Sequence, residues 1–274
     1  MAFARVQGNS ATSTSVSTSI SVSFAAPPTV GNAVVVVVAG QRPVTVTDNQ
    51  GNTYELSAIR QQSGGITATT GIHICPILVA TGSPFTVTAT LGGPNLSVTA
   101  GGLSIAIIEV SGVNFALKLD KTMGTQGFSV TPSSGATAVL TASEVFVVAA
   151  FTTGSTSPSI VVDSTTPTWT VERETLTTPS GEINTRIVGS AAGTTQNVTW
   201  TMGGGSNNWY ALIAAYTIVT VAPEPQVTQY SVETLSLPLT VDARVTQYSV
   251  EILSDATFVP PVVTESTQFF VIMP

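Results

Sequence analysis

Charge is what this chain has least of. Only 8% of its 274 residues are charged, whereas charged residues make up about a quarter of an average soluble domain. Eight Lys and Arg residues stand against fifteen Asp and Glu residues, so the formal net charge is −7. A protein that neutralises nucleic-acid phosphates needs a basic patch, and anionic membranes also attract basic segments. The composition therefore argues against nucleic acids and anionic membranes as partners.

Cysteine and histidine are nearly absent, since the chain has one of each, Cys75 and His73. One cysteine cannot close a disulfide within the chain or build a Cys-based metal site. The two residues stand two apart on a predicted strand, which resembles a nucleophile and its base. Pairing along one strand face is poor geometry, however, and no second histidine exists to complete a metal site. The sequence predicts a buried Cys75, a half-exposed His73, and neither metal nor cofactor.

Long apolar runs are also missing, although the mean hydropathy is high at +0.38. Wholly apolar runs such as residues 33–39 are at most eight residues long, and a helix that spans a bilayer needs about 20 residues. The first residues lead directly into Ser and Thr without the apolar core of a signal peptide. We therefore expect no membrane segment and no signal peptide, with the protein in the cytoplasm of the cell that makes it.

What the sequence has in abundance is β-branched residues in short runs. Val, Ile and Thr recur between Gly, Pro, Asn and Ser, a pattern typical of strands and turns, and no stretch has helical periodicity. Five consecutive valines at residues 34–38 predict a strand covered on both faces. Strict alternation at residues 13–24 predicts a strand with one solvated face. Residues 1–220 are therefore predicted to form an all-β, antiparallel, jelly-roll-like β-sandwich.

Residues 48–52 carry a clear turn signal. Asp and Asn tolerate left-handed backbone angles and Gly51 supplies a positive φ, so the segment predicts a hairpin turn. Its oxygen-bearing side chains loosely resemble a calcium loop, but the glutamate that completes an EF-hand is missing. A turn is the better interpretation.

Paired carboxylates, which most glycoside hydrolases require, are scarce. Of the nine acids in residues 1–220, only Glu172 and Glu174 share one face of a predicted strand. Surface acids are mostly solubilising, so a solvated strand face is the better interpretation of this pair. The sequence therefore predicts no catalytic residue.

Aromatic residues flank a glycine-rich loop at residues 203–205. Trp209 and Tyr210 follow this loop and are candidate glycan contacts, while Trp200 precedes it. Because aromatic residues dominate sandwich cores, burial in the core is the better interpretation for Trp200 and Trp209.

The composition changes near residue 221, where Pro223 and Pro225 favour an extended linker. Beyond it, Thr-Gln-Tyr-Ser-Val-Glu occurs at residues 228–233 and again at residues 246–251, and a weaker third copy begins at Thr267. In each copy the aromatic residue and the valine two positions later share one strand face. These predicted partner-docking residues are Tyr230, Val232, Tyr248, Val250, Phe269 and Val271.

Residues 221–274 are thus predicted to form an extended C-terminal arm with short repeated strands. Three short strands on about 54 residues can hardly bury a core of their own, so their apolar faces need the sandwich of the same chain or a neighbouring subunit. Strand addition to another chain is an established binding mode for such segments. The burial argument favours docking between subunits and leaves folding back open.

Two segments resemble proteins of tailed bacteriophages. Residues 44–54, Val-Thr-Val-Thr-Asp-Asn-Gln-Gly-Asn-Thr-Tyr, are similar to a hairpin common in β-sandwich domains of phage and bacterial surface proteins, where strands like residues 107–113 and 144–151 follow. Residues 243–253, Ala-Arg-Val-Thr-Gln-Tyr-Ser-Val-Glu-Ile-Leu, look like a segment recurrent in structural proteins of tailed phages. The resemblance implies a virion structural protein: a capsid cement or decoration protein, a head fibre, or a tail or neck component.

We therefore expect a non-enzymatic phage protein of the virion, a capsid cement or decoration protein that stabilises the particle. Extended arms suit symmetric assemblies, so the predicted partners are further copies of the chain, as in a trimer, and another virion protein such as the major capsid protein. The alternative is a carbohydrate-binding adhesin, or a fibre, tail or neck component that contacts the host surface. A glycosidase is disfavoured by the lack of a convincing carboxylate pair.

Overall fold

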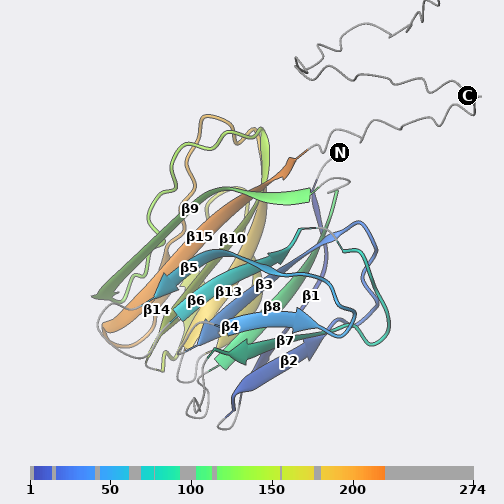
Figure 1. Ribbon diagram of the computed structural model, residues 1–274. Helices are drawn as coiled ribbons and strands as arrows, with labels where there is room; N and C mark the ends of the chain where they lie inside the picture. Colours follow the sequence, from blue (N-terminus) through green and yellow to red (C-terminus); the bar gives the residue numbers. More distant parts are fainter. Residues whose placement is uncertain are drawn as a thin grey trace, which may run out of the picture. The chain divides into compact units, whose positions relative to one another are not determined.

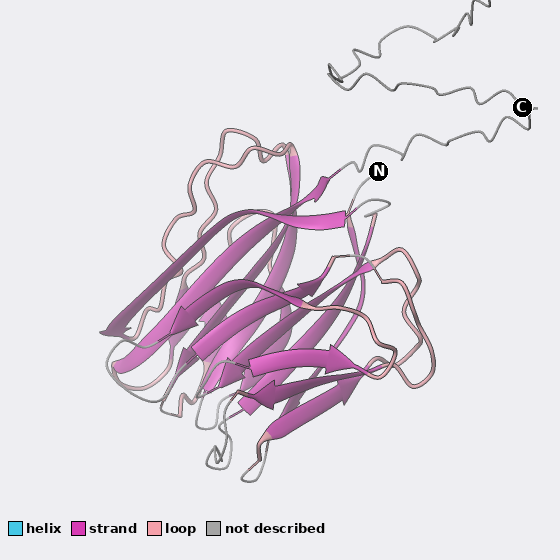
Figure 2. Ribbon diagram, in the orientation of Figure 1, coloured by secondary structure: helices cyan, strands magenta, loops and turns pink. Residues whose placement is uncertain are grey.

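The computed structural model is all-β. It describes residues 3–13, 17–40, 44–61, 69–76, 78–92, 103–112, 116–154, 156–175 and 180–219. These ranges hold fifteen strands and no helix, so no helix in them could span a membrane (Figure 1, Figure 2). Every pairing between named strands is antiparallel. The prediction of an all-β, antiparallel fold is confirmed, and the predicted arm lies outside the described residues.

Residues 3–112, which we call the first unit, contain eight strands. Five strands form a large sheet in the order β1-β8-β3-β6-β5, and three form a small sheet in the order β2-β7-β4. Their bounds are β1 Ala4–Thr12, β2 Ser19–Ser23, β3 Ala33–Gly40, β4 Val44–Asp48, β5 Glu55–Gln61, β6 Thr69–Cys75, β7 Thr86–Leu91 and β8 Leu103–Ser111.

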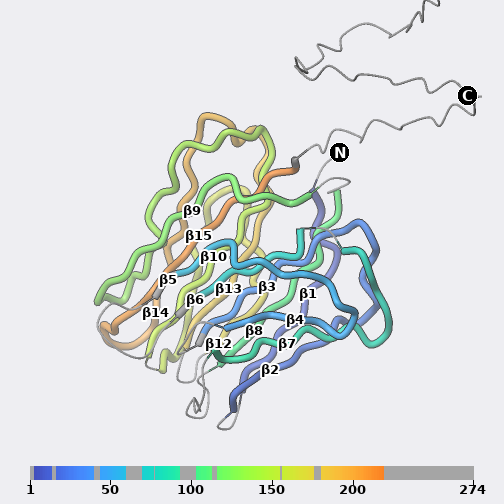
Figure 3. The backbone as a smooth tube through the Cα atoms, viewed as in Figure 1, coloured from blue at the N-terminus to red at the C-terminus, as the bar shows by residue number. Residues whose placement is uncertain are grey.

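Residues 116–219, the second unit, contain the other seven strands. The large sheet has the order β9-β15-β10-β13-β12, and β14 pairs with β11 in a small sheet. The bounds are β9 Ala116–Ser129, β10 Glu144–Thr153, β11 Ile160–Val162, β12 Thr170–Thr175, β13 Ser180–Gly189, β14 Trp200–Met202 and β15 Asn207–Val219. In Figure 3 the first unit runs from blue to green and the second from yellow-green to orange.

The two units have the same strand order. We number the strands from the start of each unit, so β1 to β8 are strands 1 to 8 of the first unit. In the second unit β9 is strand 1, and β10 to β15 are strands 3 to 8. Both large sheets then have the order 1-8-3-6-5. Residues 130–134 take the place of strand 2, because the amides of Trp200 and Met202 donate to the carbonyls of Pro132 and Val130. The small sheet of the second unit therefore also has the order 2-7-4, with residues 130–134 in the position of strand 2. The chain contains one topology twice in tandem.

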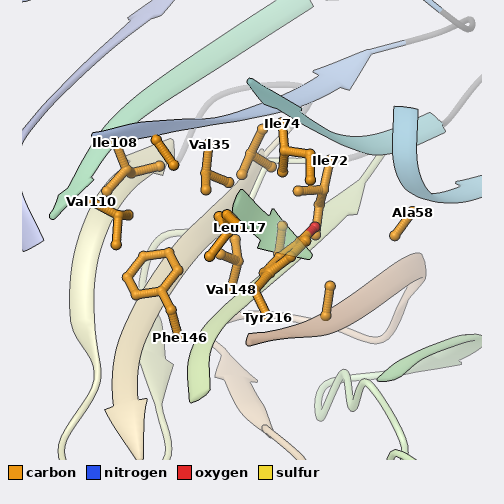
Figure 4. Close-up of a cluster of buried hydrophobic side chains, with 14 of the residues drawn as sticks. Val35, Ala58, Ile72, Ile74, Ile108, Val110, Leu117, Phe146, Val148 and Tyr216 are labelled. Atoms are coloured by element: carbon orange, nitrogen blue, oxygen red, sulfur yellow. The ribbon is translucent and has the colours of Figure 1, made fainter. Parts of the chain in front are cut away.

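The sheets stack in four layers with three apolar cores between them. The inner core lies between the two large sheets, where side chains of both units meet. Figure 4 shows Val35, Ile72, Ile74 and Ile108 of the first unit against Phe146, Val148 and Tyr216 of the second. Each outer core lies between a large sheet and the small sheet of the same unit.

The valine run in β3 serves two of these cores. Val34, Val36 and Val38 belong to the outer core of the first unit, and Val35 and Val37 belong to the inner core. Neighbouring side chains of a strand point to opposite faces, so a strand between two cores must be apolar at every position. The prediction that both faces of residues 34–38 are covered is confirmed, since all five valines are buried.

Two strand predictions are wrong in detail. Residues 13–24 do not form one strand, because β1 ends at Thr12 and β2 begins at Ser19 in a different sheet. Residues 48–52 do form a turn, in which Gly51 has a φ of 83°. It is not a hairpin turn, however, because β4 and β5 lie in different sheets. Alternation shows which side chains face water but not which strands pair.

Candidate functional site

Glu172 is expected on a solvated strand face with Glu174, but its side chain is only 1% exposed and forms an ion pair with Arg5. A β-bulge in β12 interrupts the alternation at this point. Arg5 on β1 donates from Nε and Nη2 to the two carboxylate oxygens of Glu172 at 2.6 and 2.7 Å, and Thr185 Oγ1 donates to Oε1 at 2.6 Å. The prediction that Glu172 lies on a solvated strand face is therefore wrong, because its carboxylate forms an ion pair that joins the two units.

A different acid faces Glu174. Glu182 on β13 lies directly opposite it in the β12–β13 pair, and opposite residues of an antiparallel pair have Cβ atoms about 4.5–5.5 Å apart. Glu182 is 2% exposed. Burial raises the pKa of its carboxyl group to about 7, a hydrogen bond from Asn184 opposes this shift, and the negative charge of Glu174 adds to it. A carboxyl group that titrates near neutrality has the acidity of a general acid.

The environment of Glu182 nevertheless indicates a structural role. Trp200 Nε1 donates to Asn184 Oδ1 at 2.7 Å, and Asn184 Nδ2 donates to Glu182 Oε1. Trp200 also packs on Phe151, with ring centroids 4.9 Å apart. Because Trp200, Asn184 and Glu182 are all buried in the outer core, a substrate could not reach this carboxyl group without displacing its neighbours.

His73 and Cys75 lie on β6 in the first unit. Cys75 is buried, as predicted, but His73 is only 4% exposed rather than half-exposed. Burial lowers the pKa of His73 to about 4, so the ring is neutral at physiological pH. The prediction for His73 failed because alternation identifies a face of the strand but does not show whether other parts of the fold cover that face.

Each unit has a connection between strands 4 and 5 that is organised by one aspartate. Asp48 accepts hydrogen bonds from the amide of Gln50 at 2.8 Å and the hydroxyl of Tyr54 at 3.0 Å. Asp163 accepts them from the amide of Thr165 at 3.2 Å and from Trp169 Nε1 at 3.3 Å. In both units the donors stand two and six positions after the aspartate. Sequence reasoning missed this recurring spacing, the local signal that could have revealed the two units.

Trp209 and Tyr210 are largely covered, with exposed fractions of 7% and 6%. Trp209 Nε1 donates to Ser129 Oγ at 2.9 Å, and its ring lies over Gly127, where a Cβ atom would approach it within 2.5 Å. The prediction that Trp200 and Trp209 belong to the core is confirmed. Glycan contact at Trp209 and Tyr210 stays a prediction, and the burial of both rings gives it no support.

The six predicted docking residues, from Tyr230 to Val271, lie outside the described residues. Within the ranges that the structure describes, no group of three or more His, Cys, Asp or Glu residues could hold a metal ion. The structure thus contains an ion pair between the two units, a buried carboxyl network and two aspartate-centred turns. Each of these holds the fold together.

A scan against models of protein families found no match, and searches of the curated proteins and of the solved structures found none either.

Proposed function

We propose that this protein is a non-enzymatic structural protein of a bacteriophage virion, a capsid cement or decoration protein. The observation that carries the proposal is how the two units are joined. They share one apolar core, and polar side chains tie their edges, through Arg5 to Glu172 and through Arg173 to Thr12. Groups with catalytic potential, such as Glu182 and His73, are buried within this framework. Two units joined in this way suit a structural role better than turnover of a substrate.

We further propose that each unit is a jelly roll. The order 1-8-3-6 in the large sheet beside 2-7-4 in the small sheet is the arrangement expected of two interleaved Greek keys. Strand 5 then extends the large sheet instead of completing the small one. Jelly rolls are frequent in viral capsid proteins, which is an analogy at the level of the fold and supports the proposal without choosing a position in the particle.

The proposed partners are further copies of this chain, as in a trimer, and another virion protein such as the major capsid protein. The repeated Thr-Gln-Tyr-Ser-Val-Glu segments support this proposal, since their one-sided apolar faces need a surface to cover them. Host-surface glycan binding, the alternative from the sequence, is not favoured by any observation on the described residues.

Light scattering on three forms of the protein tests this function. The full chain should be an oligomer, whereas the chain shortened to end at Thr220 and the full-length Tyr230→Ser/Tyr248→Ser variant should be folded monomers. A monomeric full chain would remove the main support for a cement protein. Binding of the full chain to a glycan array, retained in the double variant, would favour the adhesin instead.

A further inference from the structure

The small sheet of each unit ends in an open strand edge. β4 pairs with β7 on one side and β11 pairs with β14, and among the described residues no strand pairs with the other side of either. Both are strand 4 of their unit. An unpaired edge presents a row of N–H and C=O groups that can pair with another strand.

The outer edges of the large sheets and the free edge of β2 are protected. The outermost strands of the large sheets, β1, β5, β9 and β12, each carry a β-bulge, and bulges hinder further strand pairing. At the free edge of β2, Asn9 Nδ2 donates to the carbonyl of Ser23 at 2.7 Å. The regular edges of β4 and β11 are therefore the best places for an added strand.

Exposed aliphatic side chains lie beyond these edges, on strand 5. The small sheet covers the large sheet as far as strand 6, because Cys75 belongs to the same outer core as Val46 of β4. Strand 5 of the large sheet lies beyond the part that the small sheet covers. On its outward face lie Ile59 in β5 and Val171 in β12, with exposed fractions of 38% and 50%. Both units thus combine an open backbone edge with an uncovered apolar side chain.

The repeated segment of the C-terminal arm has the alternation of apolar and polar residues that a strand added at the free edge of β4 or β11 needs. Thr-Gln-Tyr-Ser-Val-Glu occurs at residues 228–233 and 246–251. As a strand it would place its tyrosine and valine on one face and Gln, Ser and Glu on the other. The apolar face would cover the aliphatic side chain of strand 5, and the polar face would continue the exposed row of Thr45 and Thr47 on β4.

The numbers of edges and segments also agree. The described residues contain two open edges of this kind, and the arm has two identical copies of the segment; each copy has six residues, compared with five in β4 and three in β11. Twelve residues, 234–245, separate the copies. Fully extended, they span about 40 Å, which lets the two copies of one arm reach separate edges.

We propose that the free edges of β4 and β11 each bind a Thr-Gln-Tyr-Ser-Val-Glu segment of a neighbouring copy as an added strand. This inference rests on the proposed function and names the surface through which the assembly forms. Main-chain hydrogen bonds to the edge provide the affinity, and packing of the tyrosine and valine on Ile59 or Val171 provides the register. An arm that binds both edges gains avidity, because the first contact raises the local concentration of the second segment.

Substitutions on strand 5 test the apolar half of the inference. Ile59→Asp/Val171→Asp in the full chain places a charge on each apolar patch and should raise the dissociation constant of the oligomer at least tenfold in sedimentation experiments. Val79→Asp/Val139→Asp, at two other exposed valines, is the matched control and should leave it unchanged. Tryptophan fluorescence and circular dichroism check that both variants are folded.

Directed cross-linking tests the edge itself. Chains with Thr45→Cys or Thr47→Cys on β4 are mixed with chains carrying Ser231→Cys and oxidised; at least one mixture should give a disulfide-linked dimer, and a mixture with Val139→Cys should not. An oligomer that keeps its affinity in Ile59→Asp/Val171→Asp and forms no β4 cross-link would overturn this inference but leave the proposed function standing. A monomeric full chain would overturn both.

Discussion

Glu182 holds a carboxyl group among apolar and aromatic side chains of the second unit. Its pKa is raised to about 7 in the fold, so the folded protein binds this proton more tightly than the unfolded chain does. The protonated form is therefore favoured, and the free energy of unfolding should decrease as the pH rises from about 4.5 to 7. One unit of pKa corresponds to about 1.4 kcal/mol, which gives an effect of roughly 3 kcal/mol.

Replacement of this acid by its neutral analogue isolates the effect. Glu182→Gln keeps an oxygen that can accept from Asn184, yet it carries no charge above pH 7. We expect the variant to be more stable than the original protein by roughly 3 kcal/mol at pH 8 and about equal to it near pH 4.5. Urea unfolding from pH 4.5 to 8 measures this. A stability difference that does not vary with pH would contradict the assignment.

His73 should respond to pH in the opposite sense. Its pKa is lowered to about 4 by burial, so the unfolded chain binds the proton more tightly and stability should be lost as the pH falls from about 6.5 to 4. His73→Gln should remove this part of the acid sensitivity. Urea unfolding of the two proteins at pH 7 and pH 4.5 measures it, and an equal loss of stability in both would show that His73 plays no part.

At the scale of elements, the connection between strands 4 and 5 depends on an aspartate in both units. Asp163 also accepts from the amide of Thr199 at 2.7 Å and so joins this connection to the segment that precedes β14. Asp48 accepts from Asn52 Nδ2 at 2.8 Å, and Asn52 Oδ1 accepts from the amides of Val79 and Ala80. One acid in each unit therefore fixes a connection that would otherwise leave several amides unpaired.

Removal of either aspartate should destabilise the protein. Asp163→Ala leaves the amide of Thr199 and the indole of Trp169 without their acceptor, and we expect a loss of about 1–3 kcal/mol in the free energy of unfolding. Asp48→Ala should have a similar effect. Glu55→Ala, at an exposed acid close to the first turn, is the control, with a change of at most about 0.5 kcal/mol. A loss at Glu55 as large as at Asp163 would point to general electrostatics instead.

Some elements could not be recognised from the sequence. β9 has no clear strand pattern because Lys118, Asp120 and Lys121 interrupt it, although the strand pairs with β15 along nearly its whole length. The β12 bulge was equally hidden, since a bulge depends on how two strands align and not on the residues of one strand. The turn at Asp48 could be recognised because Asp and Asn side chains form hydrogen bonds with the backbone of their own segment.

At the scale of the whole molecule, the two units are related by an approximate two-fold pattern. β1 of the first unit lies against β12 of the second, and β5 lies against β9. Strand 1 of each unit thus meets strand 5 of the other, as in the symmetric interface of a homodimer. Because the inner core takes side chains from both large sheets, neither unit can lose its packing without exposing the other.

The shared core predicts a single cooperative unfolding transition. All three tryptophans, Trp169, Trp200 and Trp209, lie in the second unit, so their fluorescence reports on that unit alone, while far-ultraviolet circular dichroism reports on strands of both. We expect the two signals to coincide in urea. Phe146→Ala in the inner core should lower both midpoints together, with a loss of about 3–5 kcal/mol. A circular dichroism transition that continues after the fluorescence change would show that the units unfold separately.

Properties that arise within one segment could be predicted from the sequence. They include the all-β class, the burial of both faces of residues 34–38, the turn at Asp48, and the core positions of Cys75 and Trp200. Periodicity and side-chain chemistry suffice for these because they act locally. The tertiary structure was needed to show which strands pair, that one topology occurs twice, and that Glu174 faces Glu182 while Glu172 binds Arg5. Those contacts join residues far apart in the chain, and a one-residue bulge, which no local pattern marks, reverses the direction of a side chain.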